Sequence, residues 1–288
     1  MQRLLLLFLL MLSAAVAQAR AKDLDVMTFN IRCGSCERPD DVNHWSKRKF
    51  LVADLVRKQR PDLLGLQEAE LFQVRDLAGM LAEYDWVGVG RDDGAEKGEA
   101  NAILYRKARF ELLTKKTLWL SATPEQVGKG WDAAYNRTVT ILRLRDRADG
   151  REFFLLNTHF DHMGKQARIE SSKLIAALTQ SMAGDLPVIV TGDFNYTSKD
   201  DAYRIVAGQL RDAERISRGK PRGGTFTFND FGRSLVPGNK IDFIFVNDGF
   251  DVLSHRIVPD LHRGLYPSDH FPVQARLRMR AAPSHPAP

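Results

Sequence analysis

Several apolar segments of this sequence end in a polar side chain that could take part in chemistry. Strand ends in α/β folds collect ligands, because the loops that follow them have little packing duty. Taken singly, each such residue also fits a cap, a turn or a hydrogen-bonded core residue. Their number in one chain favours a shared site, and the residues are Asn30, Glu68, His159, Asp193, Asn195, Asp269 and His270.

Short apolar runs bounded by turn residues position these side chains, and their Val, Ile, Leu and Phe content predicts strands. We expect strands at 24–31, 62–67, 102–105, 138–144, 152–158, 187–191, 240–246 and 271–277. Helical periodicity lies at 47–59, 71–81, 165–182 and 200–210, and Asp149-Gly150 is a hairpin signal. Helices mixed with hairpins favour mixed sheets with helices outside over a single parallel doubly wound sheet.

The length of 288 residues favours one large α/β domain, expected over 22–280. Arg3, the apolar stretch 4–17 and the small residues before position 20 predict a signal peptide over 1–19. An apolar stretch of about 14 residues is too short for a membrane anchor. We therefore expect an exported, periplasmic or secreted monomer without a transmembrane segment, with a disordered tail at 281–288.

The charge balance and the cysteines carry less information. Lys and Arg number 42 against 36 Asp and Glu, an excess that would attract an anionic substrate without locating the charge. The only cysteines, Cys33 and Cys36, lie in a loop rich in Gly, Ser, Pro and Asp. In an oxidising compartment a small local disulfide fits them better than a redox motif or a zinc site, which needs more ligands.

Two further groups of residues lie outside these patterns. The stretch 117–137 is the least regular part of the domain, and its aromatic residues fit either a substrate-facing loop or the core; they are Trp119, Trp131 and Tyr135. Four histidines lie outside any motif and are predicted to be surface residues: His44, His255, His262 and His285.

Seven motifs give the chain a specific resemblance to the endonuclease/exonuclease/phosphatase superfamily, which includes pancreatic deoxyribonuclease, abasic-site endonucleases, sphingomyelinases and inositol polyphosphate 5-phosphatases. The motifs are TFNIR at 28–32, LQE at 66–68, GEANAILYR at 98–106, NTH at 157–159, TGDFN at 191–195, KIDFIFV at 240–246 and PSDHFPV at 267–273. The resemblance implies a four-layer α/β/β/α sandwich, with two mixed β-sheets packed face to face and helices on both outer sides.

The resemblance also implies a metal site. Glu68 would bind a catalytic Mg²⁺ or Mn²⁺, and Asn30 and Asp269 would lie close to the metal or its waters. Oxygen ligands of this kind suit a hard divalent cation.

The two motif histidines would flank the scissile phosphate, and each would need a carboxylate behind it to support its charged form. Glu99 matches the partner of His159, and Asp242 matches the partner of His270. An acid inside the apolar strand that contains Asp242 is costly to bury unless it is paired.

The remaining residues would handle water and phosphate. Asp193 and Asn195 would orient the attacking water and the phosphate oxygens, while the guanidinium of Arg137 could meet two phosphate oxygens at once. Water would then attack phosphorus in line, assisted by the metal and an imidazolium. Either Asp193 or His270 could be the base. Asp161 and His162 follow the NTH motif closely enough to reach the substrate.

The substrate is the least determined part of the prediction, since loops select it within this superfamily. The basic balance and the deoxyribonuclease-like histidines favour, slightly, a phosphodiesterase or nuclease acting on nucleic acid. Export and the two loop tryptophans instead favour a lipid or inositol-phosphate phosphoesterase, although the sequence contains no clear apolar docking hairpin. An inactive binding protein would show damaged metal or histidine positions, and none is damaged.

Overall fold

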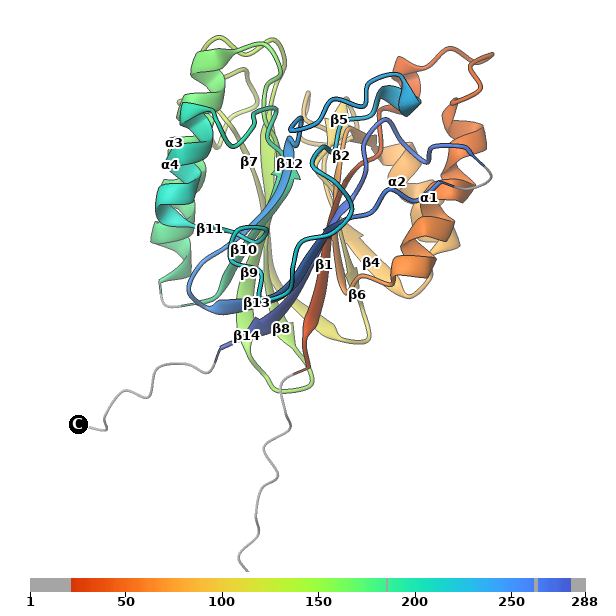
Figure 1. Cartoon of the computed structure of the whole chain (residues 1–288). Helices are drawn as coiled ribbons and strands as arrows, with labels where there is room; N and C mark the ends of the chain where they lie inside the picture. Colours follow the sequence, from red (N-terminus) through yellow and green to blue (C-terminus); the bar gives the residue numbers. More distant parts are fainter. Residues whose placement is uncertain (1–21, 185, 262–263, 281–288) are drawn as a thin grey trace, which may run out of the picture.

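The computed structural model describes residues 22–184, 186–261 and 264–280. Two six-stranded mixed sheets pack face to face, and a pair of helices covers the outer surface of each (Figure 1). This is the four-layer sandwich expected from the sequence. The predicted signal peptide at 1–19 and the predicted tail at 281–288 lie outside the described residues.

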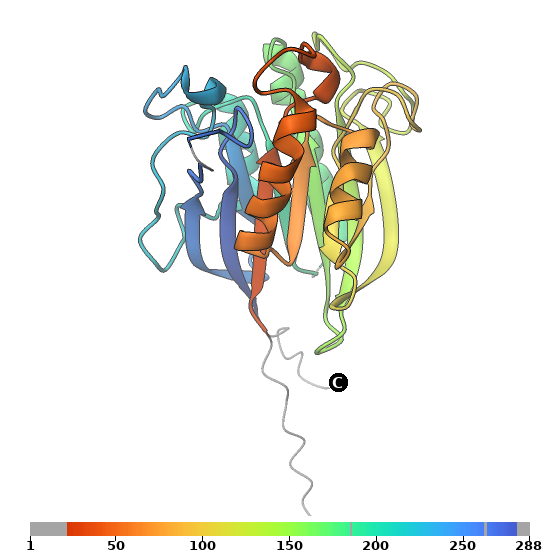
Figure 2. The ribbon, with the colours of Figure 1, turned by 90° about the vertical axis from the view of Figure 1, so that its right-hand side faces the viewer.

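The first sheet has the strand order β13-β14-β1-β2-β6-β4. Its strands are β1 (Leu24–Asn30), β2 (Leu63–Gln67), β4 (Tyr84–Val87), β6 (Ile103–Arg106), β13 (Phe250–Ile257) and β14 (Val273–Met279). Strands β1 and β2 are parallel, so their carboxyl ends reach the same edge of the sheet. Helices α1 (Trp45–Gln59) and α2 (Leu71–Met80) lie side by side on the outer face (Figure 2).

The second sheet has the order β11-β12-β10-β9-β8-β7. Its strands are β7 (Phe110–Trp119), β8 (Thr138–Asp146), β9 (Glu152–His159), β10 (Val188–Asp193), β11 (Arg211–Asp212) and β12 (Asp242–Val246). Helices α3 (Lys165–Ala183) and α4 (Asp201–Gln209) cover it. Smaller elements are the ladder of β3 (Ala69–Glu70) with β5 (Glu99–Ala100), and the 3₁₀ turns η1 (Gly34–Cys36) and η2 (Asp230–Gly232).

The central strands are buried on both faces, which explains why their sequences are continuous apolar runs. On β1, Val26 packs between the two sheets, whereas Met27 and Phe29 pack under α1 and α2. Close to the carboxyl ends of these strands, the inter-sheet layer turns polar. Asn157 there bonds Gln67 at 2.6 Å, and a Cβ on Gly65 would lie only 2.4 Å from the Asn157 amide oxygen. Gly65 therefore makes room for the polar layer beneath the site.

Every strand and helix expected from the periodicity is present, with ends that differ by no more than two residues. The expected hairpin at Asp149-Gly150 joins β8 to β9. Six strands of the described residues were not expected. Three are the two-residue strands β3, β5 and β11, and the longer three, β4, β7 and β13, each lie at an edge of their sheet. Edge strands carry more polar residues than central strands, so their apolar signal is weak. The prediction that 117–137 is irregular was wrong at its start, because Thr117 to Trp119 complete β7.

The surface prediction for His255 was also wrong. His255 lies opposite Ala275 in the β13–β14 ladder and is only 2% exposed. Its burial followed from β13, the strand that the sequence pattern did not reveal. His44 is half-buried and caps the start of α1, while His262 and His285 lie outside the described residues. Among the described residues, no helix has the length and apolarity needed to cross a membrane.

Candidate active site

The strand ends surround a cavity of about 680 Å³. Eight of the ten residues predicted for the site line it: Glu68, Glu99, Arg137, His159, Asp193, Asn195, Asp269 and His270. The other two, Asn30 and Asp242, are buried behind the wall and bond residues that line it. The structure thus brings together all ten residues, although they are up to 240 positions apart in the sequence (Asn30 to His270).

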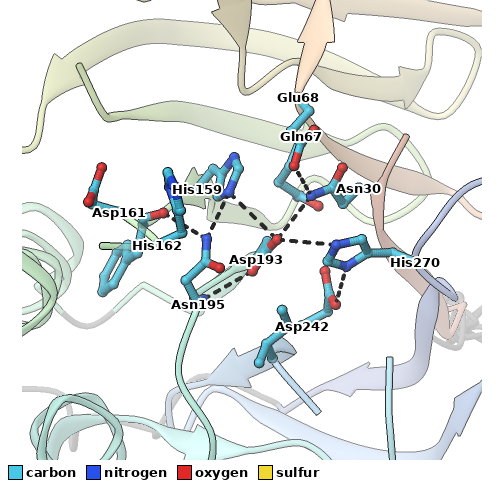
Figure 3. A network of polar contacts seen from close by, with 12 residues as sticks. Asn30, Gln67, Glu68, His159, Asp161, His162, Asp193, Asn195, Asp242 and His270 are labelled. Atoms are coloured by element: carbon cyan, nitrogen blue, oxygen red, sulfur yellow. Dashed lines mark hydrogen bonds and ion pairs between the residues drawn. The ribbon is translucent and has the colours of Figure 1, made fainter. Parts of the chain in front are cut away.

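Asp193 lies at the centre of the polar network (Figure 3). The register of the second sheet places it opposite His159 on β9 and opposite Asp242 on β12. Its Oδ2 accepts a hydrogen bond from the Asn30 amide at 2.9 Å, and Nε2 of His159 and of His270 lie 3.6 and 3.8 Å away. Burial and the nearby Asp242 carboxylate raise the pKa of Asp193 to about 7.

His270 has a close carboxylate partner. Its Nδ1 lies 2.9 Å from Oδ2 of Asp242, and both side chains are almost completely buried. Burial opposes a charge on the imidazole, but the surrounding carboxylates, above all that of Asp242, together outweigh burial and raise the pKa of His270 to about 10. Asp193 and Asp269 act in the same direction. His270 is therefore an imidazolium near neutral pH.

His159 differs from His270 in its contacts with carboxylates. On its Nδ1 side the carboxylate oxygen is Oε2 of Glu99, which lies 3.9 Å from Nδ1 and is therefore beyond hydrogen-bond distance. That same oxygen accepts a hydrogen bond from Arg91 at 2.5 Å. Burial, together with Arg137 and Arg91, holds the pKa of His159 well below its usual value. The pairing expected between Glu99 and His159 is therefore loose in this structure.

Glu68 follows β2 directly, in a left-handed backbone conformation with a φ of 57°. Asn195, just beyond β10, is also left-handed with a φ of 49°. Non-glycine residues adopt this conformation at a cost, and such strain concentrates at functional sites. In both cases the sharp turn redirects the chain at the edge of its sheet. Asn30 donates to Oε1 of Glu68 at 2.8 Å and so orients this carboxylate beside Asp193.

A disulfide-closed loop forms the wall next to Glu68. Cys33 and Cys36 are bonded to each other, as expected, and both line the cavity. The backbone N–H of Cys33 donates to Oε2 of Glu68 at 3.4 Å. Arg32, which the sequence analysis left without a role, bonds Oδ2 of Asp269 at 2.7 Å. The only signal for Arg32 was its place inside the TFNIR motif.

Arg137 is held by two neighbours that follow β9. Its Nε donates to Asp161 at 3.2 Å, and its Nη2 contacts Nδ1 of His162 at 3.1 Å. Its Nη1 is buried and has no hydrogen-bond partner among the residues that the structure describes. Burial opposes the charge of Asp161, but backbone N–H groups, first that of Gly164, and Arg137 lower its pKa. Asp161 thus supports Arg137 from behind, while His162 lines the cavity.

The aromatic residues of the stretch 117–137 separate into different environments. Trp119 is 6% exposed and donates to the backbone oxygen of Arg91, so it belongs to the core. Trp131 is 41% exposed but does not line the cavity. Tyr135 is exposed and lines it. Further lining residues that the sequence analysis did not assign are Ser35, Glu70, Arg91, Asp92, Gly98, Phe228 and Ile241.

The charge of the cavity differs in sign from that of the whole chain. Six carboxyl groups line it against three guanidinium groups, which leaves a formal excess of three negative charges before histidines and protons are counted. Ligand atoms of Glu68, His159 and Asp193 lie within 4.8 Å of one another. An oxygen-rich, negatively charged site of this size fits a hard divalent cation. The positive excess of the chain therefore does not come from this site.

Comparisons with known proteins show the family and the fold of the chain. The family model described as Endonuclease/Exonuclease/phosphatase family matches residues 27–270. A solved endonuclease/exonuclease/phosphatase from Bacteroides vulgatus is 39% identical, with a TM-score of 0.84 over 90% of this chain and 100% of that chain. A solved mannosyl-6-phosphatase from Bacteroides thetaiotaomicron is 34% identical, with a TM-score of 0.83 over 89% and 100%. Nocturnin from Drosophila melanogaster is 26% identical over 62% of this chain, which spans only 27% of that relative.

Proposed function

Because the chain belongs to the Endonuclease/Exonuclease/phosphatase family, whose members hydrolyse phosphoester bonds, we propose that it is a divalent-metal-dependent phosphoesterase. The observation that carries this proposal is the convergence of His159, Asp193 and His270 on one cavity rich in carboxylates. The two sheets contribute to it together, so the site depends on the sandwich as a whole.

Glu68 would hold Mg²⁺ or Mn²⁺, with Asp193 and Asp269 completing the acidic surroundings. When bound, the cation would neutralise charge on the phosphate oxygens and acidify a water molecule. Asn30 would contribute by orienting Glu68, since its amide nitrogen faces that carboxylate and its oxygen accepts from the Arg32 N–H at 3.0 Å.

The protein side chains then divide the work of hydrolysis. Asp193 and Asn195 would hold the water for in-line attack, and Asp193 would accept its proton, because its carboxylate lines the cavity between the two site histidines. His270, charged and fixed by Asp242, would donate from Nε2 to the phosphate group. Arg137, whose guanidinium lines the cavity, would bind a phosphate oxygen.

We propose a phosphomonoester of a small polar molecule, such as a sugar phosphate, as the first substrate class. The similarity to the mannosyl-6-phosphatase, at 34% identity over 89% of the chain, supports this class. The negative cavity also supports it, since flanking phosphates of a polynucleotide would meet carboxylates such as Glu70 and Asp92. A nucleic-acid phosphodiesterase, favoured on sequence alone, is the second candidate, and the family description with its nucleases supports it.

We further propose that the protein acts as a monomer outside the cytoplasm. The signal-like stretch at 1–19 supports export, and so does the disulfide between Cys33 and Cys36, because such bonds persist in oxidising compartments.

A hydrolysis panel tests the proposal. It contains mannose 6-phosphate, inositol phosphates, bis-p-nitrophenyl phosphate, plasmid DNA, RNA and sphingomyelin, each with Mg²⁺, with Mn²⁺ or with a chelator. Glu68→Ala and His270→Ala should lose activity, whereas Glu125→Ala, at a carboxylate 70% exposed and away from the cavity, should retain it. Activity that survives chelation or both site substitutions would refute the mechanism. Turnover of DNA alone would show that the proposed substrate class is wrong, and it would leave the proposed mechanism unaffected.

A further inference from the structure

One wall of the cavity combines a tyrosine with cationic and imidazole groups, and we call it the Tyr135 wall. It consists of Arg91, Tyr135, Arg137 and His162. The Tyr135 ring stacks on the His162 imidazole with centroids 5.9 Å apart and an interplanar angle of 20°. The guanidinium carbons of Arg91 and Arg137 lie 5.1 and 5.8 Å from the ring centroid. These contacts hold the ring in place, yet Tyr135 is still 51% exposed.

The loop that carries Tyr135 is fixed by a buried carboxylate. Oδ2 of Asp161 accepts from the backbone N–H groups of Ala134 and Tyr135, at 3.1 and 3.3 Å. Its Oδ1 accepts from the N–H groups of Met163 and Gly164. The segment that carries Tyr135 and the segment that carries His162 are therefore both held by the Asp161 side chain. A surface prepared in this way loses little conformational entropy when a ligand contacts it.

A second carboxylate, Asp92, lies at the mouth of the cavity next to this wall. Its Oδ1 accepts from the Asn136 amide at 3.1 Å. A Cβ on Gly98 would lie 2.3 Å from Oδ2 of Asp92, and Gly98 has a φ of 79°, so a glycine is needed there to accommodate this carboxylate. Among the described residues, no cation lies within ion-pair distance of Asp92. A carboxylate only accepts hydrogen bonds, so it suits hydroxyl donors and repels a second phosphate.

These features lie beside the residues proposed to bind the phosphate, since all of them line the same cavity. Arg137, the proposed phosphate ligand, belongs to the same wall as Tyr135. A phosphate held by Arg137 would thus place the group it esterifies against the exposed tyrosine ring and near Asp92. An aromatic face packs against the apolar C–H face of a sugar ring, and a few placed polar groups then set the orientation of its hydroxyl groups.

Building on the proposed phosphoesterase function, we propose that Tyr135 and Asp92 select the alcohol part of the substrate. The geometry points to a single phosphate on a polyhydroxylated ring, such as a hexose phosphate. The ring packs on Tyr135, and its hydroxyl groups donate to Asp92. A substrate with a second phosphate on the ring is rejected by the Asp92 charge.

The test compares kcat/KM for mannose 6-phosphate, for ethyl phosphate, which lacks a ring, and for a hexose bisphosphate. Tyr135→Ala should lower the preference for mannose 6-phosphate over ethyl phosphate about threefold to tenfold, mainly through KM. Tyr135→Phe keeps the ring and should keep most of this preference. Trp131→Ala, an exposed aromatic of the same loop outside the cavity, is the matched control and should not change it.

Asp92→Asn tests the charge separately, because asparagine keeps the shape of the side chain. It should raise kcat/KM for the bisphosphate relative to mannose 6-phosphate about tenfold, since the repulsion is removed. Unchanged substrate ratios in Tyr135→Ala and Asp92→Asn, with wild-type phosphomonoesterase activity intact, would overturn this inference alone. A wild-type enzyme that cleaves no phosphomonoester would overturn the inference together with the proposed substrate class. Melting temperatures of the variants identify any loss of folding.

Discussion

His159 and His270 come from different sheets and meet at the same carboxylate. His159 ends β9 of the second sheet, and His270 precedes β14 of the first. They are 5% and 4% exposed, and both direct Nε2 towards Oδ2 of Asp193. Their Nδ1 atoms differ, since that of His270 bonds Asp242, whereas that of His159 has no hydrogen-bond partner in the described part of the chain.

Asn195 shows which nitrogen of His159 carries the proton. Its Nδ2 lies 3.0 Å from the carbonyl oxygen of Phe160, which can only accept, so this atom is the amide nitrogen. The same Nδ2 lies 2.9 Å from Nε2 of His159, which must therefore accept. The proton of the neutral imidazole is then on Nδ1. One histidine of the site is a fixed cation, and the other is neutral.

The comparison shows that a placed carboxylate decides the charge of these buried histidines more than burial does. His255 supports this conclusion, because neither of its ring nitrogens has a partner among the described residues and burial lowers its pKa to about 3. Glu99 could support His159, but it is engaged by Arg91. The division of roles between the two site histidines thus depends on which acid is free.

The largest expected effect comes from removing the acid behind His270. Asp242→Asn should lower kcat about 10²- to 10³-fold, because the imidazolium loses its support and orientation. Glu99→Gln should cost only about tenfold, since Glu99 does not bond His159 directly. Steady-state kinetics at saturating metal measure both. Equal losses in the two variants would show that the histidines are equivalent in the working enzyme.

The pH dependence of stability should separate His270 from the rest of the protein. Its folded pKa of about 10 lies above its unfolded value, so its contribution is complete below pH ~6.5 and is lost as the pH rises towards 10. Denaturant unfolding of the metal-free protein between pH 7 and 9 should show a loss of about 1.4 kcal/mol per pH unit from this residue. Asp242→Asn should abolish this loss, and Glu99→Gln should preserve it. A slope that Asp242→Asn leaves unchanged would contradict the assignment.

His255 should act in the opposite direction. Its folded pKa of about 3 lies below its unfolded value, so the unfolded chain binds an extra proton as the pH falls below ~6.5. At pH 5 this proton should cost the wild type about 2 kcal/mol of stability relative to pH 7. His255→Leu should remove the cost, as measured by urea unfolding at both pH values. If wild type and variant lose stability in parallel, His255 is not the group responsible.

The smallest effect should come from releasing Glu99. Arg91→Ala removes its competing partner and a positive charge near His159, so the pKa of His159 should rise. NMR titration of the imidazole C–H signals in metal-free protein measures this value. The pKa of His270 should stay unchanged and serves as the internal reference. A constant pKa for His159 would show that Arg91 does not determine its state.

The sequence predicted the central strands and the short motifs of the site most accurately. The apolar runs of β1, β2, β9 and β10 determine both the strands and the polar residues that end them, because strands buried on two faces need continuous apolar side chains. All ten predicted site residues therefore lie at or directly behind one cavity. Edge strands such as β13 were not predicted from the sequence, because their apolar pattern is interrupted. The burial of His255 on β13 was therefore not predicted either.

The sequence by itself determined which chemical groups this protein brings to its site and the layered fold that carries them. Only the tertiary structure decided how these groups pair: that Glu99 binds Arg91, that Asp242 is left to His270, and that the cavity is negative in a positively charged chain. Pairing depends on differences of about one ångström between side chains from separate strands and loops. Such distances arise from the packing of two sheets against each other, and no local pattern of residues encodes them.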